Sequence, residues 1–160
     1  MELLPFDEYV RSLDRKRTAA GVLFRDTADR VLFVRPSYKP FWEIPGGAGE
    51  AGEPPWRTAR REVAEELGLD RVPGRLLVID HQTAAKLPEG LNFVFDGGLV
   101  AEEDVARLTF TDLEIVSARL LPLAEAEVEL EPVLARRVAA ALGAARTGEL
   151  VLCEDGHPVR

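Results

Sequence analysis

The chain has 160 residues, with 28 Asp and Glu against 20 Lys and Arg, and a formal net charge of −8. This negative balance, without a clustered basic patch in the sequence, argues against nucleic acid and against acidic membrane surfaces as partners. Hydrophobic residues make up 46% of the chain, enough to build a core and too many for a disordered protein. Since typical domains hold roughly 100–200 residues, we expect a single domain over 1–160, with an N-terminal lead-in helix within 1–16 and a C-terminal extension at 147–160.

Cysteine usage and hydropathy bear on the compartment. Cys153 is the only cysteine, so an intrachain disulfide and a thiolate zinc cluster are excluded. Acidic residues interrupt the apolar residues of 1–17, and nowhere does an apolar run approach the roughly 18 residues of a membrane span. We therefore expect a cytoplasmic protein that does not interact with membranes.

The first third of the chain predicts a short helix at 6–13 and two strands, at 18–24 and 31–35. The turn DTADR between the two strands suggests a hairpin. The following segment, 37–55, is dense in Pro, Gly and aromatic residues and shows no periodicity, so we expect a long loop there. A long loop in a domain of this size is usually functional.

A well-delimited amphipathic helix comes next. Pro54 and Pro55 occupy the positions that favour a first turn, and Gly68 offers a C-terminal stop. Apolar residues recur at helical spacing and predict a buried stripe, which consists of Trp56, Ala59, Val63 and Leu67.

The rest of the chain predicts strands at 75–80, 91–100 and 115–121, a helix at 132–145 and a short terminal strand with a turn at 149–156. Strands and helices alternate without a composition break, which indicates one α/β unit. Because hairpins are included, we expect a mixed sheet and not a wholly parallel one.

Three glutamates share one side of the helix predicted between the Pro54–Pro55 turn and Gly68. With about 100° per residue and Trp56 at zero, Glu62 and Glu66 lie near roughly 240° and 280°, beside the buried stripe, and Glu65 lies farther out near roughly 180°. Like charges at this spacing repel, and hard divalent cations with oxygen ligands, Mg²⁺ or Mn²⁺, are the natural compensation. An acidic helix face is more often simply solvated, but the spacing described next argues against that alternative.

Residues 47–69 read GAGEAGEPPWRTARREVAEELGL. Arg61 lies off the carboxylate face, and Glu53 in the preceding loop is placed to pair with it and pin the loop on the helix. The whole run resembles the complete signature of the Nudix hydrolases, with no departure at its defining positions, and WEIPGG upstream resembles the usual entry to that signature. The matching positions are Gly47, Glu53, Arg61, Glu62, Val63, Glu65, Glu66, Gly68 and Leu69.

The resemblance implies a Nudix-type α/β/α sandwich with a mixed β-sheet. It also implies hydrolysis of a nucleoside diphosphate linked to another moiety, with Mg²⁺ or Mn²⁺ held by Glu62, Glu65, Glu66 and the carbonyl of Gly47, and water activated by a carboxylate. A nucleoside triphosphate-like substrate is favoured, while ADP-ribose and nucleotide sugars stay open. So do two other functions on this fold, a catalytically silent nucleotide sensor and a diphosphate isomerase, and a homodimer as the assembly.

Residues outside the signature give further candidates. Many Nudix enzymes add a carboxylate ahead of a downstream strand; Asp112 and Glu114 stand there, and we prefer Glu114. In the loop that feeds the site, Arg35, Tyr38 and Lys39 are candidates for phosphate contacts, although surface charge explains them nearly as well. Trp42 beside the signature could stack on a base, although an aromatic residue before a buried strand is more often part of the core. Arg17 and Arg25 flank the first strand, and either could face the cleft or solvent.

Overall fold

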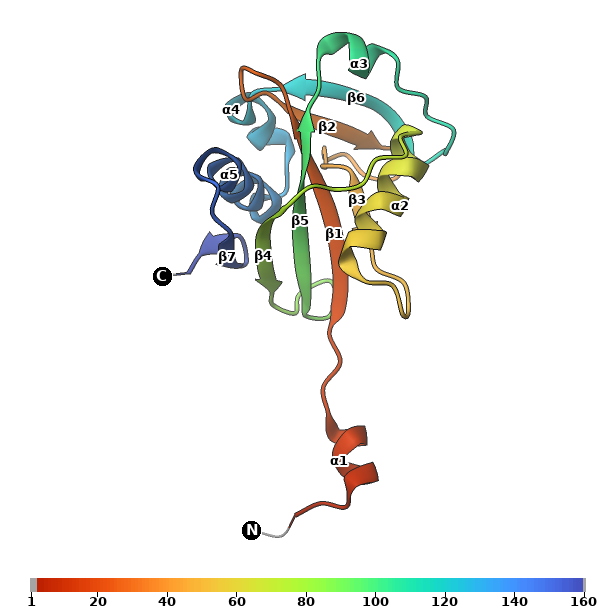
Figure 1. Ribbon diagram of the computed structural model, residues 1–160, viewed down its shortest axis with the longest axis vertical. Coiled ribbons are helices and arrows are strands. Elements are labelled where there is room, and N and C mark those ends of the chain that lie inside the picture. The colour runs from red at the N-terminus through yellow and green to blue at the C-terminus, as the bar shows by residue number, and fades with distance from the viewer. Residues whose placement is uncertain (1–2, 160) are drawn as a thin grey trace.

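The computed structural model describes residues 3–159, which form an eight-stranded mixed sheet with helices on both faces (Figure 1). The strands are β1 (Arg17–Arg25), β2 (Val31–Pro36), β3 (Gly46–Ala48), β4 (Leu76–Gln82), β5 (Gly90–Leu99), β6 (Ile115–Leu121), β7 (Val151–Glu154) and β8 (His157–Pro158). The helices are α1 (Phe6–Ser12), α2 (Pro55–Leu67), α3 (Glu102–Ala106), α4 (Leu123–Ala126), the 3₁₀ turn η1 (Glu127–Glu129) and α5 (Pro132–Thr147).

The strands follow the order β6-β2-β1-β5-β4-β7-β8, and β3 pairs with β1 outside this path. Strands β1 and β5 run parallel, as do β4 and β7, whereas the other pairs are antiparallel. The expected hairpin of β1 and β2 is present, but the two strands pair only next to the turn, where Arg25 lies opposite Val31. Nearer the start of β1, the residues from Ala19 to Gly21 pair with β3 instead of β2. A short glycine strand thus lies beside β1 where β2 has turned away.

Side chains of β1 alternate between the two faces of the sheet and feed two cores. Val22 and Phe24 pack with Val63 of α2, while Leu23 belongs to the cluster that includes Val138 of α5. Figure 1 shows α2 on one side of the sheet and α4 and α5 on the other. The predicted α/β sandwich with a mixed sheet is confirmed.

Helix α2 begins and ends where the sequence predicts. Pro55 is its first residue, and Gly68 closes it in the left-handed conformation with φ 68°, which costs glycine little because it has no Cβ. The prediction for Trp56 was wrong: its side chain is 59% exposed. Trp56 lies in the first turn, before the helix packs against the sheet, and Thr58 is buried instead.

The loop at 37–55 is more ordered than its composition suggests. It contains β3, and Glu43 forms a bridge with Val34. Both depend on pairing with distant strands, which local composition does not reveal. The short elements α3, α4 and η1 were also not foreseen.

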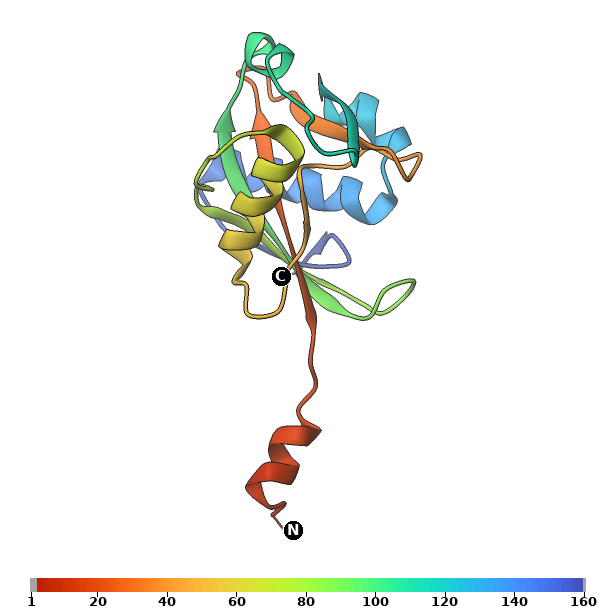
Figure 2. The same ribbon diagram turned by 90° about the vertical axis from the view of Figure 1, so that its right-hand side faces the viewer.

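The N-terminal helix α1 stands apart from the body on an extended linker (Figures 1 and 2). Its residues, 6–12, include none that is buried. Across the part of the chain that the structure describes, no helix has both the length and the apolar character required to cross a bilayer.

Candidate active site

Two buried carboxylates on α2 meet the glycine strand β3. Glu62 is 9% exposed and Glu66 is 6% exposed, although each belongs to a residue type that is rarely buried without a partner. The backbone N–H of Gly46 donates to Glu66 Oε2 at 3.1 Å. A Cβ on Gly47 would lie 2.6 Å from the Glu62 carboxylate. With glycine at position 47 the backbone reaches the Glu62 carboxylate, whereas a Cβ there would push the end of that side chain aside.

The close approach of β3 to β1 sets this arrangement. At Gly46 the backbone has φ 150°, and a Cβ there would lie 2.2 Å from the carbonyl oxygen of Ala20. Any side chain would therefore push β3 off β1 and carry Gly47 away from Glu62. The WEIPGG segment thus positions the carboxylate site through backbone geometry.

Electrostatics at this site disfavour negative charge. Burial raises the pKa of Glu66 to about 8, helped by the nearby Glu62, Glu43 and Glu114 and opposed by the Gly46 N–H. Burial also raises the pKa of Glu62, which is opposed by Arg61. Buried carboxylates that repel one another are stabilised in ionised form by a cation.

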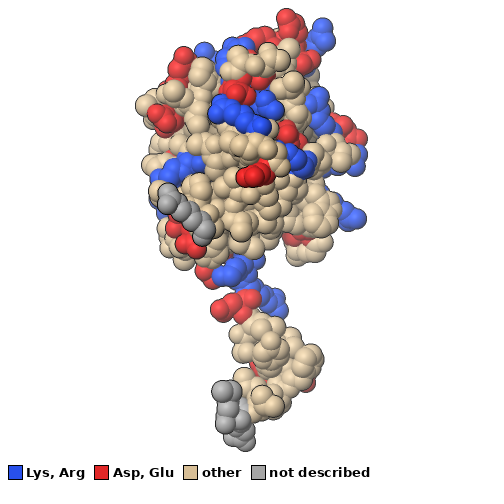
Figure 3. Space-filling view, turned by 60° about the vertical axis from the view of Figure 1, so that its left-hand side comes forward, with Lys and Arg blue, Asp and Glu red and all other residues tan. Residues whose placement is uncertain are grey.

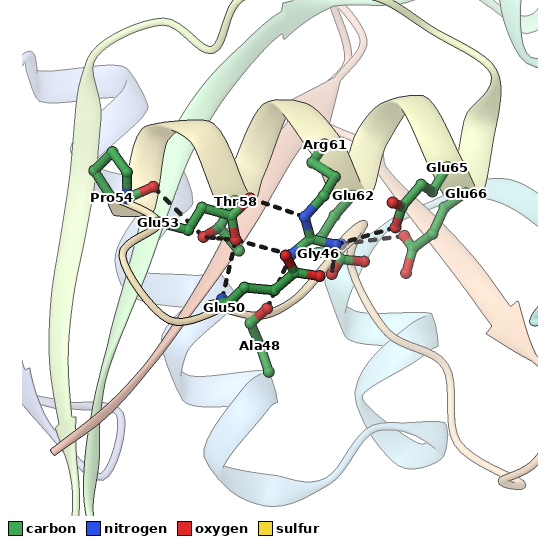
Figure 4. A network of polar contacts seen from close by, with 10 residues as sticks. All are labelled: Gly46, Ala48, Glu50, Glu53, Pro54, Thr58, Arg61, Glu62, Glu65 and Glu66. Atoms are coloured by element: carbon green, nitrogen blue, oxygen red, sulfur yellow. Dashed lines mark hydrogen bonds and ion pairs between the residues drawn. The ribbon is translucent and has the colours of Figure 1, made fainter.

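Arg61 joins the loop, the helix and the carboxylates (Figure 4). Its Nε and Nη2 donate to the two oxygens of Glu53 at 2.8 and 3.0 Å, so the predicted pair forms. The expectation that Arg61 lies off the carboxylate face was wrong, because Nη1 also donates to Glu62 at 2.8 Å and to Glu65 at 3.1 Å. The long side chain reaches along the helix, which the angle of its Cα does not show.

The loop that carries Glu53 is tied down by further donors. The Glu50 N–H and the buried Thr58 hydroxyl both donate to Glu53 Oε2, at 3.0 and 2.9 Å. Together with Arg61 they lower the pKa of Glu53 to about 2. Thr58 was not foreseen; its only signal was a hydroxyl residue between Glu53 and Arg61 at helical spacing.

The donor set suits a hard divalent cation. The carboxylates of Glu62 and Glu66 lie against the backbone of Gly47 and Gly46. Glu65 is nearby, turned toward Arg61. Within residues 3–159, no three His, Cys, Asp or Glu side chains converge closely enough to form a ready cation cage. Since Arg61 holds Glu65 and one oxygen of Glu62, a rotation of these side chains would be needed to complete the shell.

Glu114 lies in the turn before β6 and brings a fourth carboxylate toward the site. Its backbone oxygen accepts from the Ser37 N–H at 2.7 Å, and its charge contributes to the raised pKa of both Glu62 and Glu66. The alternative, Asp112, uses its Oδ1 to accept the Glu114 N–H at 2.9 Å. Asp112 therefore shapes the turn, and Glu114 is the residue whose charge acts on the cluster.

A cavity of about 450 Å³ adjoins β3 on the α5 face of the sheet. Three of the predicted substrate contacts, Tyr38, Lys39 and Trp42, line this cavity, and their role toward a substrate stays a prediction. Lys39 forms an ion pair with Glu43. Arg35 is not among its lining residues; its guanidinium lies over the Trp42 ring at 5.5 Å from the centroid. The α2 glutamates do not line the cavity either, so the two regions meet at β3 and Glu43.

The model of the NUDIX domain matches residues 15–142. The chain belongs to the Nudix family. Putative ADP-ribose pyrophosphatase YjhB of Bacillus subtilis (strain 168) is 36% identical over 64 residues, 40% of this chain and 30% of that protein. Diphosphoinositol polyphosphate phosphohydrolase 2 of Rattus norvegicus is 45% identical over 74 residues, 43% of this chain and 41% of the relative. The chain thus spans less than half the length of these two relatives.

A solved structure supports the fold assignment. The MutT protein from Methanosarcina mazei Go1 superimposes with a TM-score of 0.66 at 22% identity, covering 86% of this chain and 99% of that one. At this identity the likeness extends to the fold alone. The predicted family membership and fold are confirmed.

Proposed function

We propose that this Nudix protein is a Mg²⁺- or Mn²⁺-dependent pyrophosphohydrolase that cleaves the diphosphate linkage of a nucleoside diphosphate joined to another group. The observation that carries the proposal is the pair of buried glutamates, Glu62 and Glu66, packed against the glycine strand beside a cavity of about 450 Å³. That volume lies within the range of small-molecule sites. A nucleoside triphosphate-like substrate is favoured, with ADP-ribose and nucleotide sugars as further candidates.

In this proposal the divalent cation is held by the carboxylates of Glu62, Glu65 and Glu66 and by the carbonyl of Gly47. When bound, the cation supplies positive charge that keeps these carboxylates ionised and stabilises the charge that develops on the phosphate oxygens. Arg61, anchored on Glu53, keeps the β3 loop against α2.

The chain's own chemical task is to move one proton. Water attacks phosphorus, the bridging P–O bond breaks, and its electron pair leaves with the departing phosphate. Glu114 is our candidate for the base that takes the proton from water, because its carboxylate is near the cluster and is itself exposed. A carboxylate that water can reach is able to accept that proton.

The named relatives support the reaction class more than the substrate. One is named for ADP-ribose and the other for diphosphoinositol polyphosphate, and both names describe cleavage at a diphosphate or pyrophosphate. The two names thus share the type of bond that is cleaved and differ in the substrate.

Two other functions on the same fold have less support. A silent nucleotide sensor would not need the full carboxylate set, and this chain keeps Glu62, Glu65 and Glu66. A diphosphate isomerase would need a cysteine in the cleft, but Cys153 is 4% exposed within the core on the α5 face. The hydrolase therefore agrees best with the side chains present.

The test is hydrolysis of a substrate panel with and without Mg²⁺. The panel contains nucleoside triphosphates, ADP-ribose, nucleotide sugars and inositol pyrophosphates, each assayed in excess EDTA and after Mg²⁺ is restored. We expect activity only with the cation, and a loss of at least about 10²-fold in Glu62→Gln. Glu50→Gln, a nearby exposed carboxylate, is the matched control. Undiminished hydrolysis in EDTA would overturn the proposal, and tight nucleotide binding without any turnover would favour the sensor.

A further inference from the structure

The end of the cavity away from β3 has a polar floor made by three neighbouring strands. Arg17 begins β1, Asn92 lies on β5 and Gln82 ends β4, and all three line the cavity. Arg137 of α5 closes the same end from the opposite side. Asn92 and Arg137 are buried, only 8% and 9% exposed, whereas Arg17 and Gln82 are half-buried.

A chain of hydrogen bonds fixes the floor. Asp80, which is fully buried, accepts the Gly156 N–H at 2.9 Å and pairs with Arg137 Nε at 2.7 Å. Arg137 Nη2 in turn donates to Gln82 Oε1 at 3.0 Å. Asn92 Nδ2 donates to the same oxygen at 3.3 Å.

This series of hydrogen bonds determines how the Asn92 side-chain amide is oriented. A guanidinium only donates, so Arg137 requires the oxygen of Gln82 to face it. That oxygen cannot donate, and Asn92 must present its Nδ2 in return. Asn92 Oδ1 is then left as an acceptor, and nothing in residues 3–159 donates to it. The cavity floor therefore contains a preoriented acceptor.

Arg17 supplies unused donors on the neighbouring strand, where it pairs with Gly90, two residues before Asn92 on β5. Its Nε donates to the Pro88 carbonyl at 2.7 Å, which fixes the guanidinium beneath the β4–β5 loop. Gly90 makes the space, since a Cβ there would lie 2.6 Å from Arg17 Cγ. Nη2 is buried without an acceptor among the described residues. Nη1 is not buried and forms no hydrogen bond within residues 3–159, so it is the Arg17 donor available to a ligand that brings an acceptor.

The charge of the cavity argues against a highly phosphorylated ligand at this end. Of its three cationic lining residues, Lys39 is paired with Glu43 and Arg137 with Asp80. Arg17 forms no ion pair within residues 3–159 and is the single cation left, while Glu131 adds a negative charge at the rim. A polyphosphate needs several free cations, whereas an uncharged edge with donors and acceptors needs only a few placed polar groups.

We propose that Arg17 and Asn92 determine substrate specificity by binding the base of the nucleotide. Arg17 donates to an oxygen or ring nitrogen acceptor on the base, and Asn92 Oδ1 accepts from the neighbouring N–H. Ala19 and Gly21 on β1 leave room for the ring above the floor. This inference rests on the proposed function, because it names the substrate class of the same site, a nucleotide and not an inositol pyrophosphate.

The test measures binding in EDTA by titration calorimetry, so that no hydrolysis occurs. The ligands are the four common nucleoside 5′-monophosphates, ribose 5-phosphate as the same phosphate without a base, and inositol hexakisphosphate. We expect at least one monophosphate to bind tenfold or more tightly than both comparison ligands. Equal affinity for ribose 5-phosphate and all monophosphates, or tightest binding of inositol hexakisphosphate, would overturn the proposal.

Variants assign the effect to the two residues. Arg17→Gln and Asn92→Ala should each lower the preference for the base over ribose 5-phosphate by about tenfold, the scale of a good base contact. Arg15→Gln makes the same chemical change at an exposed position and should leave the preference unaltered. If Arg17→Gln does not fold, Arg17→Lys keeps the charge but loses the planar fork and should show the same loss.

Kinetics separate this inference from the proposed function. With Mg²⁺, Arg17→Gln should raise KM for the nucleotide at least tenfold and change kcat by less than threefold. An unchanged KM would overturn the role of Arg17. Base-dependent binding in EDTA without any hydrolysis would instead contradict the proposed function and leave the binding site in place.

Discussion

At the scale of single residues, the guanidinium of Arg61 supplies part of the positive charge that the carboxylate cluster requires. Its guanidinium contacts Glu53, Glu62 and Glu65 at 2.8 to 3.1 Å. Both oxygens of Glu53 accept from Arg61, and Oε2 also accepts from the Glu50 N–H and the Thr58 hydroxyl, so this carboxylate is fully engaged in holding the loop. This division predicts that Glu53 affects stability and that the helix glutamates affect chemistry.

Glu53→Gln should destabilise the protein in a manner that depends on pH. The pKa of Glu53 is about 2 in the folded protein, below its ordinary value of 4.5, so the fold favours the ionised form. Its stabilising contribution is complete above pH 4.5 and is lost as the pH falls toward 2. Thermal unfolding in EDTA should show a Tm lower by about 3 °C or more in the variant at pH 7, about what losing one net hydrogen bond costs.

The difference in Tm between variant and wild type should shrink steadily between pH 4.5 and 3. Glu50→Gln is the control, because the Glu50 side chain is exposed and only its backbone N–H contacts Glu53. A Tm difference that stays constant from pH 7 to 3 would exclude the ionised carboxylate as the source of the stability.

Glu114→Gln tests the proposed base. Losing a general base usually lowers turnover by roughly 10²–10⁴-fold while substrate binding is largely kept. Steady-state kinetics with Mg²⁺ should therefore show a fall in kcat with little change in KM. Glu127→Gln, an exposed carboxylate on η1, should leave both constants as they are. A rate within a few-fold of wild type in Glu114→Gln would assign the proton transfer to the α2 glutamates.

At the scale of elements, the sequence predicts best where local chemistry decides. Helix α2 was predicted to its ends because Pro55 and Gly68 act within one turn of the chain. Strand β3 was missed because it exists only through its pairing with β1. The same reason hid the cavity floor, since Arg17 and Arg137 are brought together by the sheet and by α5. The usable signal was a charged residue inside an apolar run, such as Asp80 in LLVIDH.

The interior of α5 offers a test of local propensity against packing. Gly143 is a helical residue, and a Cβ built on it meets no atom within 4 Å. Gly143→Ala should therefore raise the free energy of unfolding by about 0.5–1 kcal/mol, the helix penalty of glycine. Chemical denaturation should show a higher midpoint with an unchanged slope. Gly46→Ala is the contrasting variant, because its Cβ would lie 2.2 Å from the backbone oxygen of Ala20, and we expect it to be destabilised.

At the scale of the whole molecule, the two ends differ in how they join the body. The family match ends at residue 142, but the segment beyond it completes the sheet, with β7 parallel to β4 from Val78 to His81. Gly156 N–H reaches the buried Asp80. The N-terminal arm, residues 3–13, is different. Figure 3 shows it below the body and mostly uncharged, with acidic and basic residues where it joins, and its apolar side chains Phe6 and Tyr9 are 76% and 51% exposed.

Removing the N-terminal arm should therefore hardly change the stability, whereas removing the C-terminal strand should lower it. Deletion of residues 1–13 should shift Tm by less than about 2 °C, because stability follows the apolar area removed from water and no residue of α1 is buried. Truncation after residue 149 removes β7 and the bond to Asp80, leaving a buried carboxylate with one donor fewer, and should lower Tm by roughly 5 °C or more. Calorimetry at two protein concentrations measures both. A deletion of 1–13 that lowers Tm in a concentration-dependent way would show that the arm packs on a second copy of the chain, and a C-terminal truncation without effect would contradict the structural role of β7.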